Sequence, residues 1–235
     1  MSVYKRELVE MVKIGNINLT EHKLTLKMGG FLSINVDIIS NPFCAGMRKT
    51  DNICKHCYAY YMSTRYPRLK SALMENYNTL SSRVLTVHEI EQIGDYILKR
   101  AIGLRFNSMG ELINDIHCEN LNLIAMYIKG KKSDFPITMW SKKISAAKLI
   151  DNNYITKIYS NPNIDAPQTI APKGFDGVFN VCTYKWFKAI DEKPNCAGKC
   201  RECMKCYSPG DKHFVVYEMI KSDQVKIENG KLEEL

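Results

Sequence analysis

The sequence lacks any long apolar run. No hydrophobic stretch approaches the roughly 20 residues that a membrane helix requires. The opening residues, MSVYKR, lack the apolar core of a signal peptide. We therefore expect a cytoplasmic protein with no membrane partner.

Internal repeats, low-complexity linkers and blocks of like charge are also missing. A chain of 235 residues with 45% hydrophobic and 25% charged residues has the composition of an ordinary globular protein and can bury a real core. Its 33 Lys and Arg residues against 25 Asp and Glu residues give a net charge of +8. This surface can attract nucleic acid or another anionic partner, although it also serves solubility.

Short apolar strands alternate with helical patterns along the chain. Strands are predicted at 31–39, 104–107, 135–140, 154–159, 177–182 and 214–220, and helices at 67–80, 88–101, around 121–128 and near 143–151. The first 30 residues carry no clear pattern. The alternation predicts an α/β fold with a parallel sheet, in which ligands bind beyond the carboxyl ends of the strands.

Unusual residues follow the predicted strands at that same edge. In chain order they are Cys44, Glu111, Ser141 with Lys142, Asn161 and Cys182. One rim of the sheet could therefore present all of them. An ordinary strand end and helix cap would equally explain Ser141 and Lys142.

Nine cysteines form the main compositional anomaly, because a reducing cytosol favours metal binding over disulfides for clustered cysteines. The first group, Cys44, Cys54 and Cys57, has C-x9-C-x2-C spacing. Three thiolates can hold three irons of a 4Fe-4S cluster and leave the fourth iron open to a small molecule. Zinc is the alternative metal for such a group.

This loop resembles the cluster loop of the radical S-adenosylmethionine superfamily, which follows the first strand of a partial (β/α) barrel. His56 occupies the aromatic position before the last cysteine, and Cys57-Tyr58-Ala59 is similar to the ending found in the uncharacterised phage gene product eighty-eight family. Gly110-Glu111 resembles the family motif that binds the amino group of S-adenosylmethionine. The first cysteine gap is nine residues instead of the usual three.

The resemblance implies a partial (β/α) barrel of about six mainly parallel strands with a cysteine-rich C-terminal extension. It also implies S-adenosylmethionine as a cofactor, with His56, Gly110, Glu111, Ser141 and Lys142 near it, and an electron donor such as flavodoxin or ferredoxin. Without the resemblance, His56 is a solvent-facing loop residue and Gly110-Glu111 is a surface turn.

The second group has C-x3-C-x2-C-x2-C spacing over Cys196, Cys200, Cys203 and Cys206, and Cys182 is a fifth candidate. It suits a second 4Fe-4S cluster or zinc. We favour Cys182, Cys200, Cys203 and Cys206 as ligands, with Cys196 as the spare. The isolated Cys118 is interpreted as a small buried hydrophobe.

Two units are expected: a partial barrel over 1–182 with the cluster loop, and a cysteine-rich metal-binding extension over 183–235. The leading hypothesis is an enzyme that reductively cleaves S-adenosylmethionine to start radical chemistry on an unidentified substrate. The alternative is a zinc-binding protein that interacts with nucleic acid and whose cysteine sites are structural. An iron–sulfur electron carrier is a third reading, disfavoured because the predicted βα layout is larger than electron transfer requires.

Overall fold

A computed structural model describes residues 9–22, 28–196, 198–207, 213–220, 226–228 and 231–233 of the chain. Side chains are not described for residue 9 or for the segments beyond residue 220. The N-terminal 1–8 and parts of the predicted extension 183–235 therefore lie outside the described residues.

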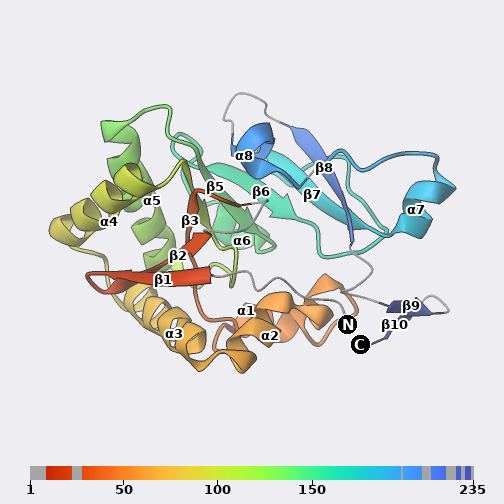
Figure 1. Ribbon diagram of the computed structural model, residues 1–235, viewed down its shortest axis with the longest axis horizontal. Helices are drawn as coiled ribbons and strands as arrows, with labels where there is room; N and C mark the ends of the chain where they lie inside the picture. The colour runs from red at the N-terminus through yellow and green to blue at the C-terminus, as the bar shows by residue number, and fades with distance from the viewer. Residues whose placement is uncertain are drawn as a thin grey trace.

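Eight strands form one sheet in the order in which they occur along the chain (Figure 1). The first two pairings are antiparallel, and the pairings from the third strand to the eighth are all parallel. The strands are β1 (Val9–Ile14), β2 (Ile17–His22), β3 (Phe31–Ile34), β4 (Gly103–Phe106), β5 (Ile137–Ser141), β6 (Thr156–Ser160), β7 (Gly177–Cys182) and β8 (Phe214–Met219). The protein is therefore α/β with a mostly parallel sheet, and this sheet does not close into a barrel.

Helices connect the parallel strands and extend beyond the sheet. The longer ones are α3 (Pro67–Ser82), α4 (Val87–Arg100) and α5 (Asp115–Lys131). The shorter ones are α1 (Pro42–Met47), η1 (Ile53–His56), α2 (Tyr58–Arg65), α6 (Ile144–Ala147), α7 (Tyr184–Ala189), α8 (Cys200–Cys203) and η2 (Lys205–Tyr207). Two further strands, β9 (Lys226–Glu228) and β10 (Lys231–Glu233), pair only with each other.

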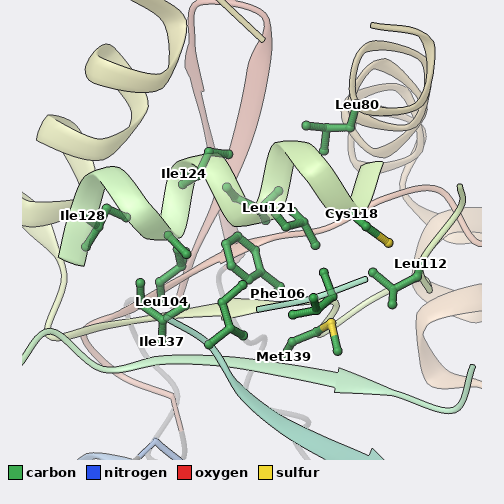
Figure 2. Close-up of a cluster of buried hydrophobic side chains, with 14 of the residues drawn as sticks. Leu80, Leu104, Phe106, Leu112, Cys118, Leu121, Ile124, Ile128, Ile137 and Met139 are labelled. Carbon is green, nitrogen blue, oxygen red and sulfur yellow. The ribbon is translucent and has the colours of Figure 1, made fainter. Parts of the chain in front are cut away.

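The main hydrophobic core lies between one face of the sheet and helices α3 to α6. Figure 2 shows Leu121, Ile124 and Ile128 of α5 directed at Leu104, Phe106, Ile137 and Met139 of the neighbouring strands. These side chains are fully or almost fully buried. The apolar stripe at helical spacing is the reason that α5 packs on the sheet.

Helix α4 shows how local sequence fixes an element of this layer. Thr86 caps its first turn, and Glu89 completes a capping box by accepting from the Thr86 backbone N–H at 2.9 Å. Ile90, Ile93 and Ile97 then recur at helical spacing and enter the core. The predicted helix at 88–101 is thus confirmed at 87–100.

The opposite face of the sheet is called the inner face below. Each parallel strand contributes one side chain to this face: Phe31 of β3, Arg105 of β4, Trp140 of β5, Ile158 of β6, Phe179 of β7 and Val216 of β8. These side chains pack with one another and with the C-terminal cysteine segment. Strand alternation separates these side chains from the core residues on the same strands.

Most of the predicted elements are confirmed, with boundaries that move by a few residues. The strand expected at 31–39 ends at Ile34, and the helix expected near 143–151 covers only Ile144–Ala147. The featureless first 30 residues contain the β1–β2 hairpin. In the described part of the chain, no helix has the length and apolar character needed to cross a membrane.

Candidate functional site

The loop that carries the first cysteine group begins directly after β3 and is built from two capped turns. Asn41 caps α1, and its side-chain oxygen accepts from the backbone N–H groups of Phe43 and Cys44 at 3.0 and 3.3 Å. Asn52 caps η1 in the same way by accepting from the Cys54 N–H at 2.7 Å. Two cysteines of the group therefore lie in turns whose backbone is fixed by an asparagine.

The cysteine loop crosses the carboxyl edge of the parallel strands and is tied down on both sides. The Asn41 amide donates to the Glu111 carbonyl at 2.8 Å, and the Tyr58 hydroxyl donates to the Ser108 carbonyl at 2.7 Å. The Ile53 N–H donates to the Pro162 carbonyl at 2.9 Å. These bonds connect the loop to the segments that follow β4 and β6.

The three thiols of this loop lie within electrostatic range of one another. Burial raises the pKa of the Cys44 thiol, and the neighbouring Glu111 and the other two thiols raise it further. Burial also raises the pKa of Cys54, whereas the nearby Lys142 lowers it. Burial thus disfavours the thiolate forms of Cys44 and Cys54, and a bound metal would supply the positive charge that offsets this effect.

Glu111, Ser141 and Lys142 meet at the same edge. The fully buried carboxylate of Glu111 accepts from the Ser141 hydroxyl at 2.6 Å and from the Lys142 backbone N–H at 2.7 Å. The Lys142 ammonium donates to the Ser160 hydroxyl at 3.1 Å, at the end of β6. Burial raises the pKa of the Glu111 carboxyl, while these hydrogen bonds act in the opposite direction.

Gly110 has a reason within the fold for being glycine. Its φ of +86° lies in the left-handed region, and an added Cβ would come 2.4 Å from the Val36 carbonyl oxygen. The close neighbour of its backbone is thus the segment after β3. This contact accounts for the glycine without any ligand.

Several polar atoms near the carboxyl edge and on the inner face are buried without a hydrogen-bond partner. They are both side-chain polar atoms of Asn107, Nε2 of His56, Nε of Arg48, Nε of Arg105 and Nε1 of Trp140. Asn107 also has a φ of +57° and directly follows β4. Unpartnered buried polar atoms are costly, and strained residues concentrate at functional sites. His56 thus lies in a polar and half-buried position rather than free in solvent.

Arg105 and Trp140 form a cationic and aromatic pair on the inner face. The Arg105 guanidinium lies 4.0 Å from the Trp140 ring centroid, and Trp140 packs on Phe179 with ring centroids 4.3 Å apart. Sequence reasoning missed Arg105. The available signal was an arginine inside the otherwise apolar strand prediction Leu104-Arg105-Phe106.

The C-terminal cysteines lie against this face. Cys196, Cys200, Cys203 and Cys206 line a common cavity of about 30 Å³. The Cys206 thiol interacts electrostatically with the other three and with Arg105. In Figure 1, α8 lies over the strands at the C-terminal side of the sheet.

Cys182 does not line this cavity. It is fully buried at the end of β7 beside Asp165, where burial raises its pKa to about 11. The cavity therefore groups Cys196, and not the Cys182 favoured from the sequence, with Cys200, Cys203 and Cys206. The chain path through α7 carries Cys196 back to β8.

The segment before Cys200 also covers the outer edge of β8. The Asn195 side chain donates to the Val215 carbonyl at 3.0 Å and accepts from the Tyr217 N–H at 2.8 Å. The Cys196 N–H donates to the Tyr217 carbonyl at 3.1 Å. The cysteine-rich segment is thereby attached to the last strand of the sheet.

Among the described residues, no three or more His, Cys, Asp or Glu side chains are arranged to hold a metal ion. The thiols of each group are nevertheless close enough to interact electrostatically, Cys44 with Cys54 and Cys57, and Cys206 with Cys196, Cys200 and Cys203.

The fold also places Cys118 and the three tyrosines of α2. Cys118 is 1% exposed and belongs to the main core, so its interpretation as a buried hydrophobe is confirmed. Tyr58 and Tyr61 are more than half exposed, while the Tyr60 ring lies 3.9 Å from the Arg48 guanidinium. None of these three tyrosines is a fully buried core residue.

No family model, no curated protein and no solved structure matches this chain.

Proposed function

We propose that the protein is a radical S-adenosylmethionine-like iron–sulfur enzyme, and that Cys44, Cys54 and Cys57 hold its catalytic cluster. One observation carries the proposal: three thiols gather on a loop fixed across the carboxyl edge of the parallel strands, next to Glu111. This is the edge at which parallel α/β proteins bind their ligands.

The strand arrangement supports the same assignment. Six parallel strands, β3 to β8, follow one another without reordering, as in a partial (β/α) barrel. The antiparallel β1–β2 hairpin extends the sheet beside β3. The cysteine loop after β3 then corresponds to the cluster loop after the first barrel strand in the family that the sequence resembles.

When bound, a 4Fe-4S cluster with one iron open to S-adenosylmethionine supplies the electron that cleaves this molecule reductively and starts radical chemistry on a substrate. The residues of the chain would hold the cluster and orient S-adenosylmethionine. Asn41 and Asn52 fix the turns that carry the thiols. Glu111 lies beside the cluster loop, where its carboxylate accepts from Ser141, Lys142 and Leu112, and we assign it to the ammonium of S-adenosylmethionine. The apolar inner face excludes water.

The test is anaerobic purification followed by iron and sulfide reconstitution of the whole chain. We expect a brown protein that absorbs at about 400 nm and, with dithionite, converts S-adenosylmethionine to 5′-deoxyadenosine. Cys54→Ala and Cys57→Ala abolish this conversion, whereas Cys118→Ala leaves it unchanged.

Two results would overturn the proposal. One is a colourless protein with stoichiometric zinc at both cysteine groups, which favours the nucleic-acid-interacting alternative. The other is full conversion by Cys57→Ala.

The surface around the cysteine loop fits an acidic electron donor such as flavodoxin or ferredoxin. Residues 42–70 contain six Lys or Arg residues and a single Asp, so most of the excess positive charge of the chain is concentrated here. Lys49, Arg65, Arg68 and Lys70 are exposed. A basic surface steers an acidic partner toward the site it surrounds.

Charge reversal at this surface separates docking from chemistry. Lys49→Glu slows cluster reduction by ferredoxin roughly tenfold at low salt but leaves reduction by dithionite unchanged. Lys99→Glu on α4, an exposed lysine on another helix, is the control and changes neither rate. Equal rates for Lys49→Glu and the unmodified protein would exclude this docking surface.

A further inference from the structure

We propose that Cys196, Cys200, Cys203 and Cys206 hold a second iron–sulfur cluster, ligated by four thiolates, on the inner face of the sheet, and that Cys182 takes no part in it. The site is distinct from Cys44, Cys54 and Cys57. It stands whether or not those residues bind a cluster of their own.

The cavity defines the ligand set. Its lining includes all four of these cysteines together with Met204, Tyr207 and Val216, and it excludes Cys182. Its volume of about 30 Å³ exceeds what a single water requires, roughly 10–15 Å³. The four cysteines thus line one shared space.

The backbone between the cysteines explains how they come to face one space. Helix α8 covers Cys200–Cys203 and ends at Met204, which has a φ of +52°. The Met204 N–H donates to the Cys200 carbonyl at 2.9 Å, so the chain reverses there and returns Cys206 toward Cys200. Left-handed residues commonly terminate helices in this way.

The surroundings combine apolar side chains with cations: the half-buried Arg105 interacts with the site, and Lys199 and Lys205 line the cavity. Cys196 and Cys206 pack against Ile158, Phe179 and Val216, and Cys200 and Cys206 pack against Met28, Phe31 and Tyr207. Arg105 interacts electrostatically with Cys206 from the strand beneath. A cluster with four thiolates carries net negative charge, which in an apolar environment requires such a counter-ion.

Spacing favours iron over zinc. The run Cys200, Cys203 and Cys206 reproduces the C-x2-C-x2-C arrangement of bacterial ferredoxins. These three cysteines line one cavity together with Cys196.

The experiment removes the first cysteine group by substitution and measures how much iron and sulfide the second cysteine group still binds. The triple variant Cys44→Ala, Cys54→Ala, Cys57→Ala is reconstituted anaerobically with iron and sulfide in the presence of equimolar zinc. We expect about four irons and four sulfides per chain. In that background Cys196→Ala loses at least half of the iron, whereas Cys182→Ala keeps all of it.

Three results would overturn the proposal: zinc without sulfide, absence of any metal in a variant whose circular dichroism is unchanged, or iron loss on Cys182→Ala but not on Cys196→Ala.

If the triple variant fails to fold, Mössbauer spectroscopy of the unmodified chain decides instead. S-adenosylmethionine must then leave a four-iron component unperturbed, and Cys206→Ala must remove that component. Failure of the catalytic proposal alone would leave these results unchanged.

Discussion

Arg105 contacts both the aromatic side chains of the inner face and the C-terminal cysteine segment. Its guanidinium covers Trp140, and it also interacts electrostatically with Cys206 and Tyr207. A half-buried cation at this place stabilises added negative charge. Its Nε atom has no hydrogen-bond partner among the described residues, so its position is not explained by hydrogen bonding alone. Electrostatic compensation gives it a physical role.

If the proposed C-terminal cluster is present, removing this charge changes its reduction potential. Arg105→Gln makes the reduced cluster less stable, so we expect the potential to fall by about 60 mV, which corresponds to about 1.4 kcal/mol for one electron. Arg105→Lys, which keeps the charge, shifts it less. Potentiometric titration followed by electron paramagnetic resonance measures the change. Arg68→Gln on the exposed surface of α3 is the control, and an equal shift there would contradict the role of Arg105.

At the scale of single elements, two glycines respond to alanine in opposite ways. Gly110→Ala places a Cβ against the Val36 carbonyl at a positive φ, and we expect a loss of about 2–3 kcal/mol of unfolding free energy. Gly130 lies within α5 with no neighbour within 4 Å of an added Cβ. Gly130→Ala therefore stabilises the protein by about 0.5–1 kcal/mol. Urea denaturation measures both, and stabilisation by Gly110→Ala would contradict the described turn.

The capping box of α4 predicts a pH dependence of stability. Hydrogen bonds from Arg83 hold the pKa of Glu89 well below its usual 4.5. The contribution of a carboxyl with a lowered folded-state pKa is fully present above about pH 4.5 and is lost as the pH falls toward the folded-state value. Glu89→Gln should therefore lower the unfolding free energy by about 1 kcal/mol at pH 7 and by less at pH 3. Urea titrations at the two pH values test this, and an equal loss at both would refute it.

How far the sequence predicts this structure also depends on the element. Ile90, Ile93 and Ile97 recur on one helical face, so α4 could be read directly. Strand β2 could not, because it includes the buried polar residues Asn18 and Thr20. The Asn18 amide donates to the Ala72 carbonyl and to Glu75, and the Thr20 hydroxyl accepts from Asn35. Buried polar residues whose hydrogen-bond partners are distant in the sequence interrupt the hydrophobic pattern by which a strand is predicted.

The same contrast holds for the candidate site. Glu111, Ser141 and Lys142 were expected at one rim because each follows a parallel strand, and they do meet there. The grouping of Cys196 with Cys200, rather than Cys182, was not predictable, since it depends on the turn after α7 that returns the chain to β8. Spacing identifies candidate ligands, while the path of the chain selects among them.

For the whole molecule, the two sides of the sheet differ in what holds them together. Helices α3 to α6 cover one face through a continuous apolar core, whereas the inner face is covered by a short segment with four cysteines. Stability should therefore be unevenly distributed and should depend on metal on one side only.

Metal removal tests this distribution. After anaerobic chelation, amide hydrogen exchange should accelerate by at least tenfold, or about 1.4 kcal/mol, in the segment from Asn195 to Tyr207 and in β8. Exchange in α4 and α5 should stay unchanged. Uniform acceleration across both layers would contradict this prediction.

The contacts of Asn195 and Cys196 with β8 have a consequence for colloidal behaviour. A last strand whose hydrogen-bonding groups are uncovered is a template for pairing with the same strand of another molecule. Asn195 and Cys196 occupy the Val215 and Tyr217 groups at that position, and the proposed cluster holds the segment in place. Iron supply would then govern not only the chemistry of the protein but whether it stays dispersed, so that chains made under iron starvation would accumulate as aggregates.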